Sequence, residues 1–203
     1  MDVLFNKNTI FKSRKNAMKK IYQLTLLTIL VFTFSACQTQ HKVLNREIKS
    51  ETGERFLIGE FDRNALQQKH YINWYNEEYD AYEVENSKLV NLKKSDFKSL
   101  KIEVFVGTWC SDSQRELPRF YKILENLKFP IESRLNVYGV NRQKKSFYGE
   151  EIGKDITHVP TIIVYKKGKE IGRIVESPVS GYLEEDFEKI VNGNPLTPNY
   201  AED

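Results

Sequence analysis

The 203-residue chain is poor in cysteine and histidine, with two of the first (Cys37 and Cys110) and three of the second. The histidines, His41, His70 and His158, lie far apart and lack the paired spacing of zinc ligands. We therefore infer no metal site, and we expect no cofactor.

The chain also lacks an excess of positive charge outside its first 36 residues. Its formal net charge is +3, but residues 1–36 hold six Lys/Arg and one acid, so the remainder has 25 basic and 27 acidic residues. No RNA-binding pattern of aromatic and basic residues is present either. We therefore expect no nucleic-acid partner. Hydrophobic residues make up 40% of the chain, which indicates a globular domain with a core.

The basic residues at the start belong to a leader that resembles an export signal. Lys19 and Lys20 precede an uncharged apolar stretch over 21–34, and small residues then lead to Cys37. The segment resembles a lipoprotein signal, which predicts a signal peptide over 1–36, lipid on Cys37 and a membrane-anchored protein facing the periplasm. A plain signal peptide or an uncleaved anchor helix is the alternative, but the stretch is shorter than the roughly 20 apolar residues of a spanning helix.

If Cys37 carries lipid, the folded part has one thiol, Cys110, and no internal disulfide. A lone thiol is unusual in an exported protein because the compartment oxidises such groups. The residue therefore calls for an explanation.

Composition divides the exported part into four segments. Residues 38–53 are polar without a period, and 37–60 are therefore expected to be a tether. Residues 61–100 are expected to be an aromatic-rich helical extension, 101–195 the main domain, and 196–203 a C-terminal tail. The aromatic residues of the extension recur at loose helical spacing, which favours a packed helix over a binding surface. They are Tyr71, Trp74, Tyr75, Tyr79 and Tyr82.

Hydrophobic periodicity predicts alternating strands and helices from residue 101 onward. The predicted strands are 101–106, 134–140, 162–165 and 170–175, and the predicted helices are 110–127, a short one within 141–155, and 182–191. Lys167-Gly168 reads as the turn of a hairpin between the last two strands. The order indicates an α/β fold whose sheet has one antiparallel edge.

Four features of this region, taken together, resemble the thioredoxin superfamily. They are Trp109-Cys110-Ser111-Asp112-Ser113 between a strand and a helix, Pro118 within that helix, Val159-Pro160-Thr161 before a strand, and the Lys167-Gly168 turn. The resemblance covers roughly residues 95–195. It implies a thioredoxin-like fold, a central mixed sheet flanked by helices, with a cis Val159–Pro160 bond beside Cys110.

The resemblance also implies chemistry at Cys110. A helix N-terminus favours the thiolate, which is the nucleophilic form. Trp109 is expected to shield the sulfur, and Val159 and Pro160 to hold a substrate backbone. Ser113 stands where the family has a second cysteine, and it either caps the helix or stabilises the thiolate.

Other departures from the family affect proton transfer. The family's buried acid falls on Val104, and Glu103 beside it is out of phase, so a proton-relay carboxylate is not expected. Asp112 opposes the thiolate through its charge. His158 is either a surface histidine or close enough to Cys110 to assist its ionisation.

These observations predict a thiol–disulfide oxidoreductase or isomerase that acts through Cys110 alone. Its partners are protein or small-molecule thiols and disulfides, and a second thiol from the substrate or from a small molecule resolves the mixed disulfide. The alternative is a non-catalytic thioredoxin-fold module that binds a peptide or protein. Thiol reactivity discriminates between the two.

Overall fold

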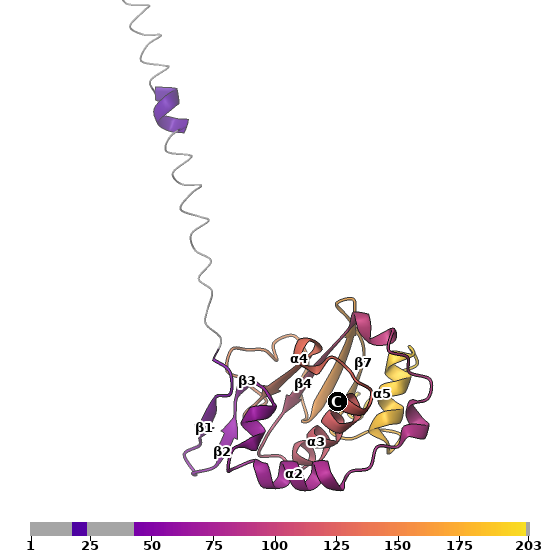
Figure 1. Ribbon diagram of the computed structural model, residues 1–203. Helices are drawn as coiled ribbons and strands as arrows, with labels where there is room; N and C mark the ends of the chain where they lie inside the picture. The colour runs from indigo at the N-terminus through magenta and orange to yellow at the C-terminus, as the bar shows by residue number, and fades with distance from the viewer. Residues whose placement is uncertain (1–17, 24–42, 202–203) are drawn as a thin grey trace, which may run out of the picture. The chain divides into compact units, whose positions relative to one another are not determined.

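The computed structural model describes residues 18–23 and 43–201 (Figure 1). The chain divides into two units, Met1–Lys42 and Val43–Asp203. In the first, residues 18–23 are helical. The rest of the predicted signal peptide, and Cys37 with it, lies outside the described residues. Among the described residues, no helix is both long enough and apolar enough to span a bilayer.

The second unit contains both strands and helices. Its strands are β1 (Glu47–Lys49), β2 (Arg55–Leu57), β3 (Gly59–Phe61), β4 (Leu100–Val106), β5 (Leu135–Gly139), β6 (Thr161–Lys166) and β7 (Lys169–Val175). Its helices are η1 (Arg63–Gln67), α2 (Ile72–Ala81), η2 (Asn86–Leu89), η3 (Asp96–Ser99), α3 (Ser111–Asn126), α4 (Ile131–Arg134) and α5 (Leu183–Val191).

Five of the strands form one mixed sheet in the order β3-β5-β4-β6-β7. β4 and β5 are parallel, and the β3–β5, β4–β6 and β6–β7 pairs are antiparallel. The sheet is flanked by helices, so the expected α/β class is confirmed and is compatible with a thioredoxin-like fold. The antiparallel strand β3, which the sequence did not predict, forms a second antiparallel edge.

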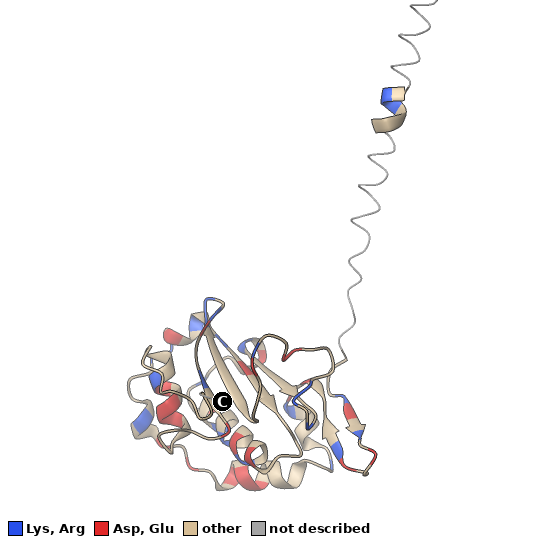
Figure 2. Ribbon diagram, turned by 180° about the vertical axis from the view of Figure 1, so that it is seen from behind, with Lys and Arg blue, Asp and Glu red and all other residues tan. Residues whose placement is uncertain are grey.

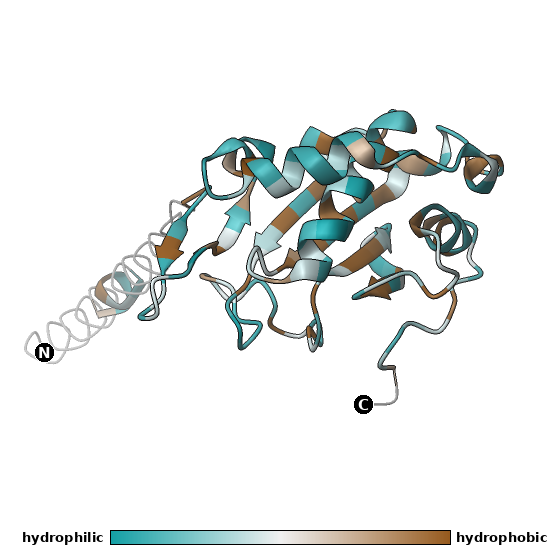
Figure 3. Ribbon diagram, turned by 90° about the horizontal axis from the view of Figure 1, so that it is seen from below, coloured by the Kyte–Doolittle hydropathy of each residue, from teal (hydrophilic) through white to brown (hydrophobic). Residues whose placement is uncertain are grey.

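The two faces of β4 belong to different apolar clusters. Ile102, Val104 and Val106 pack with residues of α3 and α5 in the main core, whereas Phe105 faces a smaller cluster on the opposite side. This alternation is the two-residue period of a strand that is buried on both faces. In Figure 3 brown, hydrophobic segments recur along the strands of the sheet, and the helices are largely teal on their outer sides. The central strands carry few of the charged residues (Figure 2).

The expected tether over 37–60 is wrong for its second half. Residues 47–61 contain three strands, and Phe56, Leu57 and Ile58 are buried. β3 pairs with β5 at the sheet edge, where a side chain on Gly139 would overlap the Leu57 backbone. The fold therefore begins well before residue 61.

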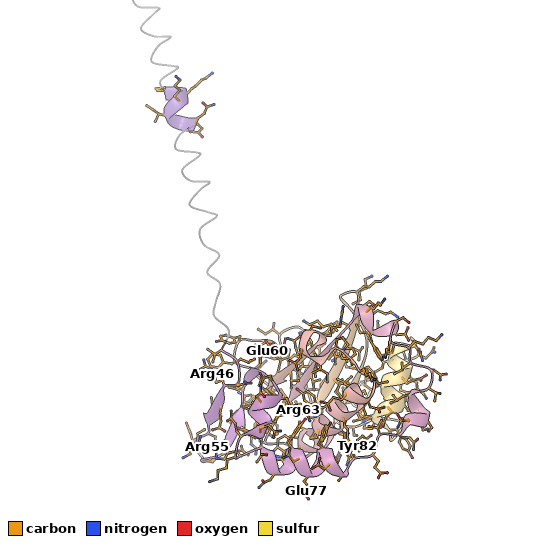
Figure 4. All side chains as sticks on the ribbon, viewed as in Figure 1. Arg46, Arg55, Glu60, Arg63, Glu77 and Tyr82 are labelled. Carbon is orange, nitrogen blue, oxygen red and sulfur yellow. The ribbon has the colours of Figure 1, made fainter. Side chains whose placement is uncertain are left out.

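The aromatic extension packs as predicted. Tyr71 and Tyr75 are buried in the main core, and α2 lies along α3 (Figure 1). Tyr82, labelled in Figure 4, donates its hydroxyl to the carboxylate of Glu184 on α5 at 2.8 Å. The extension is thus part of the core rather than an appendage.

The short helix expected within 141–155 is wrong. This fully described segment contains only turns, and the short α4 lies before β5 instead. Asn141 accepts hydrogen bonds from the backbone of Gln143 and Lys145, and Ser146 bonds the carboxylate of Glu150. Such local bonds satisfy backbone groups without a helix.

Candidate functional site

Cys110 lies at the N-cap position of α3, in the turn that follows β4. Its backbone N–H donates to the Gly107 carbonyl at 2.8 Å, and its carbonyl accepts from the Gln114 N–H at 3.0 Å. The side chain is half-buried and packs at the margin of the smaller apolar cluster. The predicted strand–turn–helix arrangement around the thiol is confirmed.

The thiol contacts the loop that precedes β6. Cys110 Sγ lies 3.4 Å from the Val159 carbonyl oxygen, to which it donates. The Val159–Pro160 bond is cis, as predicted, and Val159 is buried. The antiparallel pairing of β4 with β6 brings the two segments together, because it places Phe105 opposite Thr161.

Trp109 is held beside the thiol by three contacts. Its indole Nε1–H donates to the Val140 carbonyl at 2.8 Å. Its ring covers Gly107, where a Cβ would lie 2.5 Å from indole Cε2, so the position needs glycine. The Arg142 guanidinium lies 4.7 Å from the centre of a Trp109 ring and is bonded to both carboxylate oxygens of Glu54. Neither Arg142 nor Glu54 was singled out in the sequence.

Ser113 is buried, and its Oγ accepts a hydrogen bond from the Gly107 N–H at 3.2 Å. The hydroxyl therefore ties the first turn of α3 back to the end of β4. This bond was not among the roles predicted for Ser113. Its proposed effect on the thiolate stays a prediction.

The charge of Asp112 beside the thiol is partly compensated. Asp112 forms an ion pair with Arg115 one turn later on α3, with 2.8 Å between Oδ1 and Nη1. Both side chains are partly exposed, so solvent screens the pair. Asp112 consequently opposes a negative charge on Cys110 less than an unpaired carboxylate would.

Glu103 is a buried carboxylate on the Phe105 side of β4, while Val104 points into the main core. Glu103 forms ion pairs with Lys154 and, at 3.3 Å, with Lys101. Burial alone raises the pKa of Glu103, but the two lysines outweigh it and hold the pKa below 4.5. The carboxylate is therefore charged at neutral pH and is poorly suited to carry a proton.

His158 precedes Val159 but is held by other groups. Its ring stacks on Tyr200 with 3.8 Å between ring centroids and 9° between planes. Its Nδ1 lies 3.1 Å from the Thr157 hydroxyl. Of the two predicted roles, these contacts favour that of a loop histidine.

The structure thus brings Trp109, Cys110, Ser113, Val159 and Pro160 together around one turn. The sixth predicted site residue, the lipidation site Cys37, lies outside the described residues. The arrangement offers a half-buried thiol at a helix start beside a cis-proline loop. Such a thiol can exchange with a disulfide or bind a peptide through the same loop.

Comparison with known proteins gives limited but consistent support. No family model matches the chain. A thioredoxin-like protein of Acanthamoeba polyphaga mimivirus is 31% identical over 84 residues, which is 41% of this chain and 58% of the relative. The chain thus matches little more than half of that relative. The similarity supports a place among thioredoxin-like proteins.

Proposed function

We propose that this protein is a thiol–disulfide oxidoreductase that acts through the single cysteine Cys110. The observation that carries the proposal is the position of this thiol, at the start of α3 and 3.4 Å from the Val159 carbonyl. The unpaired N–H groups of a helix start favour the thiolate. The similarity to a thioredoxin-like protein supports the same reaction class.

The reaction at Cys110 proceeds by two exchanges. The Cys110 thiolate attacks one sulfur of a substrate disulfide, a Cys110–substrate disulfide forms, and the other substrate sulfur leaves as a thiolate that takes up a proton. A second thiol then attacks the mixed disulfide and releases Cys110. If that thiol is a small molecule, it first forms a mixed disulfide with the substrate sulfur; a second molecule of the same thiol then attacks that bond, so the substrate is reduced and the two small molecules are joined in a disulfide. If the thiol belongs to the substrate, the disulfide is only rearranged.

The residues around Cys110 have distinct roles in this scheme. The Val159 backbone next to Pro160 holds an extended substrate segment, and Trp109 forms one wall of the site. Ser113 maintains the turn through Gly107 and, because it is not a cysteine, leaves the mixed disulfide without an internal resolving thiol. A mixed disulfide formed here is consequently long-lived.

Membrane anchoring is the second part of the proposal. The charged, apolar and small-residue order of the leader supports export and lipid attachment at Cys37, with the folded unit in the periplasm. The lipid would hold the domain at the membrane while Cys110 meets thiols and disulfides there.

A non-catalytic peptide-binding module is the alternative. The Cys110 thiol already donates to the Val159 carbonyl, and the buried carboxylate Glu103 is held by lysines rather than free to move a proton. Both features fit an unreactive thiol in a binding groove.

Exchange with oxidised glutathione distinguishes the two functions. The protein is incubated with oxidised glutathione and its intact mass is followed with time and pH. The oxidoreductase gains one glutathione at Cys110 faster than an unfolded control gains it, and Cys110→Ser gains none at that position. If exchange is no faster than in the unfolded control, the oxidoreductase is refuted and the protein is the peptide-binding module.

A further inference from the structure

The C-terminal segment after α5 crosses to the loop that holds Val159. Asn199 Nδ2 donates to the carbonyls of Val175, at 3.3 Å, and Ser177, at 3.0 Å. The Tyr200 hydroxyl donates to the Glu176 carboxylate. The tail is therefore attached to the end of β7 rather than left in solvent.

The same attachment places Tyr200 against the cis-proline loop. The Glu176 N–H donates to the Pro160 carbonyl at 2.7 Å, so the residue that accepts from Tyr200 is itself bonded to the loop. The Tyr200 ring stacks on His158, the residue directly before Val159. His158 and Tyr200 thus form an aromatic pair one residue away from the carbonyl that contacts Cys110.

This position matters for a long substrate more than for a small one. A polypeptide that pairs with Val159 extends along the neighbouring residues at about 3.3 Å per residue, and so it passes His158. A low-molecular-weight disulfide needs only to reach Cys110 Sγ. An obstruction at the aromatic pair would therefore act on the first class of substrate and not on the second.

We propose that Tyr200 is a specificity-determining residue that selects small disulfides over polypeptide disulfides. This inference rests on the proposed function of Cys110. Tyr200 is itself 44% exposed, so the aromatic pair is a surface contact whose removal spares the core. It acts by blocking the approach of substrate and not by holding the fold together.

The test compares two substrates across two variants. Rates of mixed-disulfide formation are measured with oxidised glutathione and with a peptide disulfide of about ten residues, for the wild type, Tyr200→Ala and Tyr200→Phe. In the wild type a peptide must displace the Tyr200 ring from His158 before it can pair with Val159, and a weak contact of this kind slows a rate by about fivefold. Tyr200→Ala should therefore raise the rate with the peptide by about fivefold and leave the rate with glutathione within about twofold of the wild type. Tyr200→Phe keeps the ring against His158 and loses only the bond to Glu176, so its peptide rate should stay closer to that of the wild type than to that of Tyr200→Ala.

Equal rates in Tyr200→Ala and the wild type, or an equal change for both substrates, would overturn the inference. Absence of any exchange in the wild type would instead overturn the proposed function. In that case alkylation of Cys110 at alkaline pH still tests the obstruction, with iodoacetamide as the small probe and a peptide-linked iodoacetamide as the large one. Tyr200→Ala should then raise the rate of alkylation by the large probe alone. If the two probes gain equally, or neither gains, the role of Tyr200 is refuted.

Discussion

Replacing Lys154 with methionine should destabilise the fold, because it removes the closest partner of the buried Glu103. The Glu103 side chain is 9% exposed and that of Lys154 24%, so solvent screens the pair little. Removing one partner of a buried ion pair typically costs about 3–5 kcal/mol. Lys101 remains, 3.3 Å away but 51% exposed, and offsets part of this loss. We therefore expect a loss of about 2–3 kcal/mol.

The effect should depend on pH in a defined direction. The pKa of Glu103 is lowered in the folded protein, below the ordinary 4.5, so its ion pair stabilises the fold above that value. This stabilisation is lost as the pH falls from 4.5 through the lower pKa of the folded state. The difference between wild type and Lys154→Met should therefore be largest at neutral pH and shrink in acid.

Thermal and urea unfolding of residues 43–203 at neutral and acid pH measure both effects. For a domain of this size, about 2–3 kcal/mol corresponds to a fall in Tm of roughly 5–10 °C. The double variant Glu103→Gln/Lys154→Met should recover part of the loss, and Lys101→Met should cost less than about 1 kcal/mol. A loss under about 0.5 kcal/mol in Lys154→Met, or one that is independent of pH, would refute the reasoning.

Four further changes test the site and the fold. Cys110→Ser should abolish glutathione exchange and leave Tm nearly unchanged, because serine suits an N-cap; residual exchange would contradict the role of the thiol. Ser113→Cys should shorten the lifetime of the mixed disulfide, measured by mass, at a cost of about 1 kcal/mol for the lost Gly107 bond; an unchanged lifetime would mean that the second thiol cannot reach the first. Gly139→Ala should cost more than about 2 kcal/mol in urea unfolding because its Cβ overlaps the backbone, and a neutral result would refute the β3–β5 packing. Cys37→Ser should release the protein from membranes, and unchanged membrane association after fractionation would refute lipidation.

The turn around Cys110 and its contact with Val159 could be predicted, and the distant charge pairs could not. Hydrophobic periodicity predicts the strand and the helix on either side of the turn from Trp109 to Ser113. The closeness of Val159 to the thiol is implied by the resemblance to the thioredoxin superfamily. Arg142 meets Glu54 across 88 residues, and Lys154 meets Glu103 across 51. A single sequence carries no signal for such pairs.

The missed strands have a similar cause. β1, β2 and β3 are three residues each, too short for an alternating pattern to stand out. Residues 141–155 are polar and include Gly149 and Gly153, a composition that does not by itself exclude a short helix. The side chains of Asn141 and Ser146 accept hydrogen bonds from nearby backbone N–H groups, and these bonds stabilise turns in this segment instead of a helix.

The short strand β3 also protects the protein from self-association. It pairs from Gly59 to Phe61 with residues 137–139 of β5, so this part of the β5 edge is paired within the chain rather than open to another chain. An uncovered edge of this kind is a template for aggregation. The Leu57 N–H just before β3 also donates to the buried Thr108 hydroxyl, two residues before Cys110. A chain shortened to begin at residue 61 would thus lose solubility and the support of the Cys110 turn together.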